Sequence, residues 1–471
     1  MDSERELTDF WKSEIKHRFP PKALGQKVTL IGGRKVRNCY LDNAATTKPF
    51  SAVKRAVDAY LDMCESIHRG AGSLSTLSTD IFETARERIA RFAHAPENAY
   101  VIITSNTTGA MNQAAALWKE YLEERTQGGE ILISDVEHSS SSLPYLQHHH
   151  NVICFGTVDS QFDIQHIREI LQSCGGSIKL ISITGASNVT GYKPPIHEIA
   201  ELAHEHGAQI LVDVCQYIQH NRVDMKPPRG KRGSGKNNLD FIAFSGHKIY
   251  APYGAGILIG PKDFFDTVGP YQIGGGNLSY ITPDWRIKKL DRVQAHDPGT
   301  PNAVGVIAIA VAMDELNHIG MDNVAAYEHG LMELACDGLS GIESVVLYPH
   351  DRSGSILPFD IRDIPHKLVA KALTLEYGIS VRSGAFCAYR LVSRLKGIPL
   401  KQEIGLEHQI DSGFMSAIPG LVRASVSLFN RVEDIRRLIG AVGDIAEKGP
   451  GHFKERYRMD YKTGEWYPMT S

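Results

Sequence analysis

Short apolar runs that alternate with amphipathic helical patterns constrain the fold more than any other feature of this sequence. Six runs have the length and composition of buried strands. They are 100–104, 130–134, 179–184, 209–213, 241–244 and 256–260. Helical patterns also occur in this region, at 79–95, from about 105 to 122, and at 195–206. Because alternation of strand and helix is typical of a mostly parallel sheet covered by helices, we expect an α/β protein.

Polar residues follow directly after one of these strands. The run at 241–244 breaks into Ser245, Gly246, His247 and Lys248. Such residues lie at the rim of a sheet, where α/β proteins place their ligand sites. A lysine held there can act as a nucleophilic amine and form the Schiff base that pyridoxal 5'-phosphate (PLP) chemistry needs. Ser245 and His247 are then candidate hydrogen-bond donors to the phosphate. The alternative for Lys248 is a solvated side chain, which is the more common case for a lysine that closes a strand.

A carboxylate occupies the equivalent place on the run at 209–213. Asp213 ends that run, where it can pair with a pyridinium nitrogen and keep the ring protonated as an electron sink. Gln216 can donate to the phenolic oxygen of the same ring. The alternative interpretation of Asp213 is a helix cap.

The combination of Asp213, Gln216 and the Ser-Gly-His-Lys segment at 245–248 resembles the class V aminotransferase family of fold-type-I PLP enzymes, and within it the cysteine desulfurases. The resemblance covers about residues 40 to 445. It implies a mostly parallel seven-stranded sheet in a large domain, plus a smaller α/β C-terminal domain. We expect an N-terminal lead-in at 1–38 that packs with the small domain, a PLP-binding domain at 39–302, and the small domain with a cysteine loop and an insert at 303–471.

The polar turn before the predicted helix at 105–122 is a candidate phosphate seat. Thr107 and Thr108 stand where free backbone N–H groups and the helix dipole favour an anion, although a threonine N-cap explains one of them equally well. The resemblance places the phosphate-binding threonines here. It also implies that His138 stacks on the pyridine ring and relays protons, and that Asn188 reaches cofactor or substrate. Thr300 would reach the phosphate of the partner subunit's cofactor, which implies a homodimer with shared active sites.

The amino-acid substrate is expected to lie against three further residues. Ala44 belongs to a YLDNAATT segment that the family has beside its substrate pocket, and its small side chain allows close approach. The alternative for this segment is a plain loop. Arg382 and Arg423 match family arginines near the substrate carboxylate, a task that suits the bidentate guanidinium.

Cys387 determines which reaction we expect. A thiolate on a flexible loop can attack the sulfur of a cysteine substrate and leave a persulfide and alanine, whereas most cysteines are inert small residues. The sequence departs from the desulfurases around this thiol, with Ala385 and Phe386 in place of histidines. An insert at 389–419, predicted as a helix plus a lid, follows, and Gly72 replaces a histidine of the family's HRGxH segment.

Composition excludes several other classes of protein. The net charge of −3 gives no reason to expect nucleic acid or an anionic membrane as a partner. No run approaches the roughly 18–20 apolar residues of a membrane span, and the charged N-terminus lacks a signal core. Seven scattered cysteines without a CxxC pair suggest reduced thiols in the cytoplasm. The basic stretch at 226–238 is interpreted as a solvated loop, and no metal site is expected at His148–His150, because consecutive residues do not share one face.

These observations predict a PLP-dependent cysteine desulfurase that moves sulfur from L-cysteine to Cys387 and then to an acceptor protein. One alternative keeps PLP but not the persulfide, as in an aminotransferase, an epimerase or a C–S lyase acting on another amino acid. A second alternative is a sulfur-delivery binding protein with a decayed site. The intact set of Asp213, Lys248 and His138 argues against decay.

Overall fold

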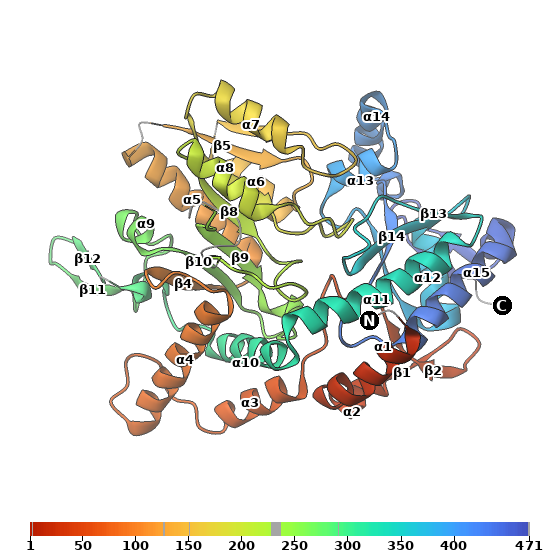
Figure 1. Ribbon diagram of the computed structural model, residues 1–471, viewed down its shortest axis with the longest axis horizontal. Coiled ribbons are helices and arrows are strands. Elements are labelled where there is room, and N and C mark those ends of the chain that lie inside the picture. The colour runs from red at the N-terminus through yellow and green to blue at the C-terminus, as the bar shows by residue number, and fades with distance from the viewer. Residues whose placement is uncertain (2, 126–127, 150, 228–236, 291, 470–471) are drawn as a thin grey trace. The chain divides into compact units, whose positions relative to one another are not determined.

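The structure, a computed structural model, describes residues 1, 3–125, 128–149, 151–227, 237–290 and 292–469 (Figure 1). The chain forms two compact units. Unit 1 contains Met1–Lys48, Ser187–Tyr192 and Asp322–Ser471, and unit 2 contains Pro49–Ala186 and Lys193–Met321. These limits differ from the expected boundary at 302, because helix α10 (Ala303–Ile319) packs against α3 (Ser51–Leu61) and α4 (Ser73–Phe92) of unit 2.

Unit 2 is built on a seven-stranded sheet with the strand order β4-β10-β9-β8-β7-β5-β6. Strand β10 runs antiparallel to both of its neighbours, and the other pairs are parallel. The predicted mostly parallel seven-stranded sheet is therefore confirmed. The strands are β4 (Ala99–Thr104), β5 (Glu130–Ser134), β6 (Val152–Phe155), β7 (Ile178–Thr184), β8 (Gln209–Asp213), β9 (Phe241–Ser245) and β10 (Gly256–Pro261).

Helices cover this sheet, with α5 against β9 and β10 and α8 against β8. Aromatic rings anchor α5: Trp118 lies 5.9 Å from Phe241 of β9 and 5.1 Å from Phe264, measured between ring centroids. The remaining helices and the hairpin of unit 2 are α5 (Thr107–Arg125), α6 (Ser139–His148), α7 (Ile164–Ser173), α8 (Ile196–Glu205), α9 (Lys262–Thr267), the 3-10 helices η3 (Gly246–Lys248) and η4 (Val293–His296), and strands β11 (Leu278–Ile281) and β12 (Ile287–Lys289).

Helix α4 begins at Ser73, earlier than the predicted start at 79. Its first turn is rich in hydroxyl side chains, which normally favour caps over helix interiors. Here the hydroxyl groups instead form hydrogen bonds with carbonyl groups one turn earlier in the same helix. Thr76 Oγ1 donates to the carbonyl of Gly72, and Thr79 Oγ1 donates to the carbonyl of Ser75. The hydrophobic pattern alone therefore predicted too short a helix.

Unit 1 contains a four-stranded antiparallel sheet with the order β13-β14-β17-β16. The described strands of unit 1 are β1 (Lys27–Thr29), β2 (Lys35–Arg37), β3 (Cys39–Tyr40), β13 (Val345–Leu347), β14 (Ile356–Ile361), β15 (Ile379–Ser380), β16 (Arg382–Gly384), β17 (Leu421–Ser425), β18 (Tyr457–Met459) and β19 (Trp466–Pro468). Its helices are α1 (Glu4–Phe10), α2 (Pro21–Leu24), α11 (Met321–Ser340), α12 (His366–Tyr377), α13 (Tyr389–Leu395), α14 (Leu400–Asp411) and α15 (Val432–Lys454), with short π and 3-10 turns at Trp11–Ile15, Lys16–Arg18 and Met415–Ala417.

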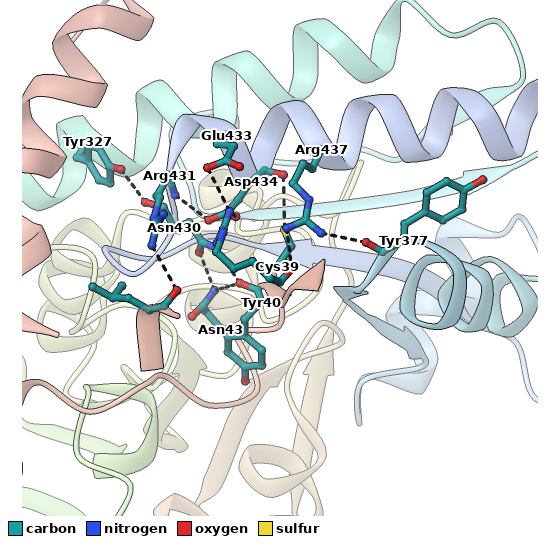
Figure 2. Close-up of polar contacts among 12 residues, drawn as sticks. Cys39, Tyr40, Asn43, Tyr327, Tyr377, Asn430, Arg431, Glu433, Asp434 and Arg437 are labelled. Atoms are coloured by element: carbon teal, nitrogen blue, oxygen red, sulfur yellow. Dashed lines mark hydrogen bonds and ion pairs between the residues drawn. The ribbon is translucent and has the colours of Figure 1, made fainter. Parts of the chain in front are cut away.

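The N-terminal segment joins the C-terminal part of the chain through β3, which pairs in parallel with β15. Polar contacts clamp this segment to the start of α15 (Figure 2). The Asn430 amide donates to the Tyr40 carbonyl at 2.7 Å, the Asn43 amide donates to Asn430 Oδ1 at 2.9 Å, and Arg37 pairs with the buried Asp434. Residues 40–43 are thereby held beside β17.

Two sequence expectations fall partly outside the described residues. Of the basic stretch at 226–238, residues 228–236 are not described, and neither is His150 of the histidine triplet. His149 is described, and its Nε2 lies 2.8 Å from the carbonyl oxygen of Ala115.

Within the described ranges no single helix is both long and apolar enough to cross a membrane, although the bent pair of α10 and α11 meets that criterion jointly.

Candidate active site

The ends of two neighbouring strands bring Asp213 and Lys248 to one edge of the sheet in unit 2. Asp213 is the last residue of β8 and is paired in register with Ala243 of β9. Lys248 ends the short 3-10 helix η3, which follows β9 directly. Since β8 and β9 are parallel, their carboxyl ends share an edge, and Lys248 is partly buried there.

The Asp213 carboxylate is fixed in orientation by one hydrogen bond to each oxygen. Ser141 Oγ donates to Oδ2 at 2.6 Å, and the backbone N–H of Cys215 donates to Oδ1 at 3.0 Å. The side chain is 5% exposed. A carboxylate oxygen accepts more than one hydrogen bond, so capacity remains for a cationic ring N–H. The sequence did not single out Ser141; its position three residues after His138, at the start of α6, was the available signal.

The N-terminus of α5 has the hydroxyl groups expected of a phosphate seat. Thr107 is buried, and its backbone N–H donates to Ser245 Oγ at 2.7 Å, while its own hydroxyl lies 2.6 Å from Ser245 Oγ and 2.8 Å from Cys215 Sγ. Thr108 is exposed, and its hydroxyl lies 2.7 Å from that of Ser140. The two predicted threonines thus point in different directions: Thr107 faces the end of β9, and Thr108 faces the start of α6.

Close backbone packing holds this turn against the sheet. A Cβ added at Gly256, the first residue of β10, would lie 2.4 Å from the carbonyl carbon of Asn106. A Cβ at Gly109 would lie 2.9 Å from Ser105 Oγ. The first turn of α5 is therefore a cradle of backbone, hydroxyl groups and glycine. This donor set fits a phosphate, and Asp213 fits a protonated ring nitrogen, so the residues present suit PLP.

His138 is held by its own helix. It is the N-cap of α6, and its Nδ1 accepts a hydrogen bond from the backbone N–H of Ser140 at 3.1 Å. Nδ1 must therefore be unprotonated, so the neutral ring carries its proton on Nε2.

Two of the remaining predicted cofactor residues of unit 2, Gln216 and His247, follow β8 and β9 at the same edge as Asp213 and Lys248, and Thr300 precedes α10. Gln216 is buried and follows β8, and its Oε1 lies 3.5 Å from Gln219 Nε2. His247 is partly buried in η3. Thr300 is exposed in the turn before α10 and lines a cavity of about 730 Å³ together with Thr108.

A second carboxyl group, Glu137, lies close enough to Asp213 for their charges to interact. Its Oε1 accepts hydrogen bonds from Ser134 Oγ at 2.5 Å and from the backbone N–H of Thr184 at 3.0 Å. Burial raises the pKa of Glu137 to about 8, and the charge of Asp213 adds to the shift. Glu137 is therefore mainly a neutral acid at pH 7. No sequence signal distinguishes Glu137, because a glutamate before a histidine is unremarkable by itself.

Unit 1 holds the predicted substrate arginines on neighbouring strands. Arg382 of β16 is exposed and is paired in register with Arg423 of β17, which is 2% exposed. Arg423 Nη1 donates to the carbonyl of Asn188 at 2.7 Å, and Nη2 pairs with Asp42 at 3.1 Å. Burial lowers the pKa of Arg423 to about 10, and the Asp42 charge opposes that shift, so the guanidinium stays charged at pH 7.

Two neighbours of Arg423 come from the YLDNAATT segment. Asp42 supplies the negative charge opposite the Arg423 guanidinium, a role that the sequence did not predict. The backbone N–H of Ala44 donates to Ser425 Oγ at 2.9 Å. The segment is therefore tied to β17 rather than being a plain loop, with Ala44 buried.

Cys387 is exposed on a tight turn between β16 and α13. The turn is closed by a hydrogen bond from the backbone N–H of Ala388 to the carbonyl of Ala385 at 2.9 Å. The insert that follows forms α13 and α14, and Lys396 anchors it to Asp360 of β14 at 2.6 Å. Residues of the insert, α12 and β14 line a cavity of about 900 Å³.

Comparisons with known proteins show which family this chain resembles over most of its length. The family model described as aminotransferase class-V matches residues 39–438. A probable cysteine desulfurase of Halalkalibacterium halodurans is 33% identical over 432 residues, covering 90% of this chain and 95% of that protein. A cysteine desulfurase of Haloferax volcanii is 31% identical, covering 87% and 89%.

Solved structures are similar over the same extent. The apo structure of a cysteine desulfurase from Thermococcus onnurineus has a TM-score of 0.74 and 26% identity, covering 88% of this chain and 95% of that one. The cysteine desulfurase CsdA of Escherichia coli has a TM-score of 0.72 and 25% identity, covering 86% and 94%.

Proposed function

The chain belongs to the class V aminotransferase family, and we propose that it is a PLP-dependent cysteine desulfurase that moves the sulfur of L-cysteine to Cys387. Family membership confirms the resemblance seen in the sequence. The observation that carries the proposal is that Asp213 ends β8 and Lys248 follows the end of β9, at the shared edge of two adjacent parallel strands. A lone lysine or a lone carboxylate at a strand end has ordinary explanations, whereas the two together suit a pyridine ring and its carbonyl group.

The residues that would hold PLP divide by chemistry. Thr107, Thr108 and the N-terminus of α5 would bind the phosphate, Asp213 the ring nitrogen, and Lys248 the carbonyl carbon. When bound, PLP supplies an electron sink that stabilises negative charge at the substrate α-carbon.

The chain's own groups then perform the proton transfers. The Lys248 amine takes the proton from the substrate α-carbon, acting as a general base. His138 offers a proton at Nε2, since Nδ1 is occupied by the Ser140 N–H. Ser141 and the Cys215 N–H keep the Asp213 carboxylate from rotating away from the ring nitrogen. Arg382 and Arg423 would orient the substrate carboxylate.

Sulfur transfer requires the thiolate of Cys387. Its Sγ attacks the substrate sulfur, a sulfur–sulfur bond forms, and the bond from substrate Cβ to sulfur breaks. The electron pair of the broken bond stays with the three-carbon product, which takes up protons and leaves as alanine. The enzyme keeps the sulfur as a persulfide, so no external oxidant or reductant is needed.

The proposal extends to partners and compartment. The enzyme would be a homodimer in which Thr300 of one subunit reaches the phosphate of the other, and a separate acceptor protein would collect the persulfide sulfur in the cytoplasm. Two observations support this extension. Thr300 is exposed beside a cavity that also contains Thr108, and no disulfide joins any of the seven cysteines, all of which are described.

Two substitutions test the proposed function. Cys387→Ser should abolish persulfide and alanine formation from L-cysteine while keeping the visible absorbance of bound PLP. Lys248→Ala should abolish that absorbance band. The matched control is Cys64→Ser, which removes an exposed thiol of unit 2 and should change neither.

Each alternative predicts a different result. An aminotransferase, epimerase or C–S lyase would keep full turnover of another amino acid after Cys387→Ser. A sulfur-delivery binding protein would show no PLP absorbance in the unmodified protein. Either result would exclude the desulfurase.

A further inference from the structure

The turn that carries Cys387 has an unusual backbone. Phe386 has φ +55° and Cys387 has φ +56°, so two successive residues that are not glycine lie in the left-handed region. With the hydrogen bond from Ala388 to Ala385, this matches a type I′ turn, which normally requires glycine, asparagine or aspartate. A bulky phenylalanine in this region is strained, and such strain persists only where surrounding contacts hold it.

The contacts that hold the turn converge on Phe386. Its side chain is 6% exposed, and the Arg423 guanidinium lies 4.7 Å from the centre of its ring. Its carbonyl oxygen accepts a hydrogen bond from the Asn188 side-chain amide at 2.7 Å. Asn188 in turn accepts from Arg423 through its backbone carbonyl at 2.7 Å. Phe386, Asn188 and Arg423 therefore form a closed ring of contacts, and Asp42 pairs with the guanidinium from outside that ring.

We propose that Phe386 is a positioning residue, which presents the Cys387 thiol by clamping the strained turn onto the Arg423 guanidinium. The inference rests on the proposed function only in taking Cys387 as the sulfur acceptor. A cation over an aromatic face is attracted by the ring quadrupole, most strongly when both groups are out of water. Arg423 and Phe386 meet that condition, whereas Cys387, the next residue, is exposed.

The arrangement also gives a physical reason for a phenylalanine at position 386, where the resemblance to the desulfurases implies a histidine. A histidine ring beside a buried guanidinium would add a titratable group and weaken the contact when protonated. A phenylalanine keeps the contact independent of pH. The thiol is consequently offered from a fixed turn rather than from the flexible loop expected from the sequence.

The experiment compares Phe386→Tyr, Phe386→Leu and Phe386→Ala. Tyrosine keeps the aromatic face, leucine keeps most of the volume without it, and alanine keeps neither. A nitroxide spin label is attached to Cys387 in a background carrying Cys64→Ser, Cys154→Ser and Cys174→Ser, which leaves only buried cysteines besides the target. Desulfurase kinetics are measured on the same substitutions with Cys387 unlabelled, and melting temperatures accompany both.

We expect an immobilised label in the parent and in Phe386→Tyr, and a several-fold larger mobile fraction in Phe386→Leu and Phe386→Ala. The kcat for sulfur transfer should fall about tenfold in Phe386→Ala and be restored by tyrosine, because misplacing a reacting group by about 1 Å costs up to about a hundredfold. Phe414→Ala, at an exposed aromatic residue of the same unit, should change neither quantity.

Two results would overturn this inference, and a third would separate it from the proposed function. Unchanged label mobility and kcat in Phe386→Ala would overturn it. Equal losses of kcat and melting temperature in all three variants, tyrosine included, would reduce Phe386 to a core residue and also overturn it. A label that responds as expected in a protein that forms no persulfide would support the clamp while excluding the desulfurase.

Discussion

Among single residues, Glu137 shows how burial changes the chemistry of a carboxyl group near the proposed PLP site. Asp213 and Glu137 interact, and burial raises the pKa of Glu137 to about 8. Both oxygens of Asp213 are hydrogen-bonded, whereas Glu137 Oε2 has no partner among the described residues. A neutral Glu137 avoids placing a second negative charge beside the group that should hold a protonated ring.

Glu137→Gln should reduce the dependence of stability on pH. In the unfolded chain the carboxyl titrates near its ordinary pKa of 4.5, and in the folded chain near 8. The raised pKa stabilises the fold fully below pH 4.5, and that contribution is lost as the pH rises to about 8. The free energy of unfolding of the wild type should thus fall between pH 5 and pH 8 by about 2–4 kcal/mol more than that of the variant.

Denaturant unfolding of both proteins at these two pH values measures the effect. Glu97→Gln, at an exposed carboxylate, is the control and should keep the wild-type dependence. Parallel curves for wild type and Glu137→Gln would show that Glu137 is ionised in the folded protein.

At the level of elements, the proposed phosphate site depends on how tightly the start of α5 packs on β10. A hydrogen bond from the backbone N–H of Thr107 to Ser245 Oγ, at the end of β9, orients Thr107. Gly256 allows the backbone of Asn106 to approach β10. A loop held between two strands cannot relax away from an added methyl group, because the contacting atoms are backbone.

Gly256→Ala should therefore displace the first turn of α5. We expect a loss of about 1–3 kcal/mol in the free energy of unfolding, as for other overpacked sites, and at least a tenfold weaker affinity for PLP. Calorimetry and absorbance titration of the apoprotein with PLP measure the two effects. Gly440→Ala is the control, since its Cβ meets nothing within 4 Å and α15 should gain slightly in stability. Unaltered PLP affinity in Gly256→Ala would contradict the role given to this contact.

At the scale of the whole molecule, the proposed homodimer makes a prediction that a monomer does not. Lys248→Ala removes the lysine proposed to form the Schiff base, and Thr300→Ala removes a hydroxyl that would act in the other subunit. A heterodimer of the two variants contains one site with both defects and one site with neither. Equal mixing should therefore restore about a quarter of the wild-type sites when PLP is limiting.

The measurement is PLP retention and desulfurase activity after the two variants are unfolded and refolded together. Separate refolding followed by mixing is the control and should restore nothing unless subunits exchange. No gain from joint refolding would mean that Thr300 serves its own subunit or no site at all.

Much of the sheet was predictable because its signals are local. An apolar run is recognised as a strand from its own residues alone. Because the carboxyl ends of parallel strands lie at one edge of a sheet, the sequence alone predicts that Asp213 and residues 245–248 lie near each other. The insert was likewise recognised as helical, although it forms two helices rather than a helix and a lid.

Contacts between distant parts of the chain could not be predicted in this way. Asp42 and Arg423 are separated by 381 positions, and no local pattern pairs them. The same holds for Ser141 on Asp213 and for the ring of contacts around Phe386. The sequence by itself determined which strands form the sheet and which candidate site residues follow the ends of those strands. Only the tertiary structure decided their charge, orientation and strain, because those properties depend on burial and on partners that the fold supplies.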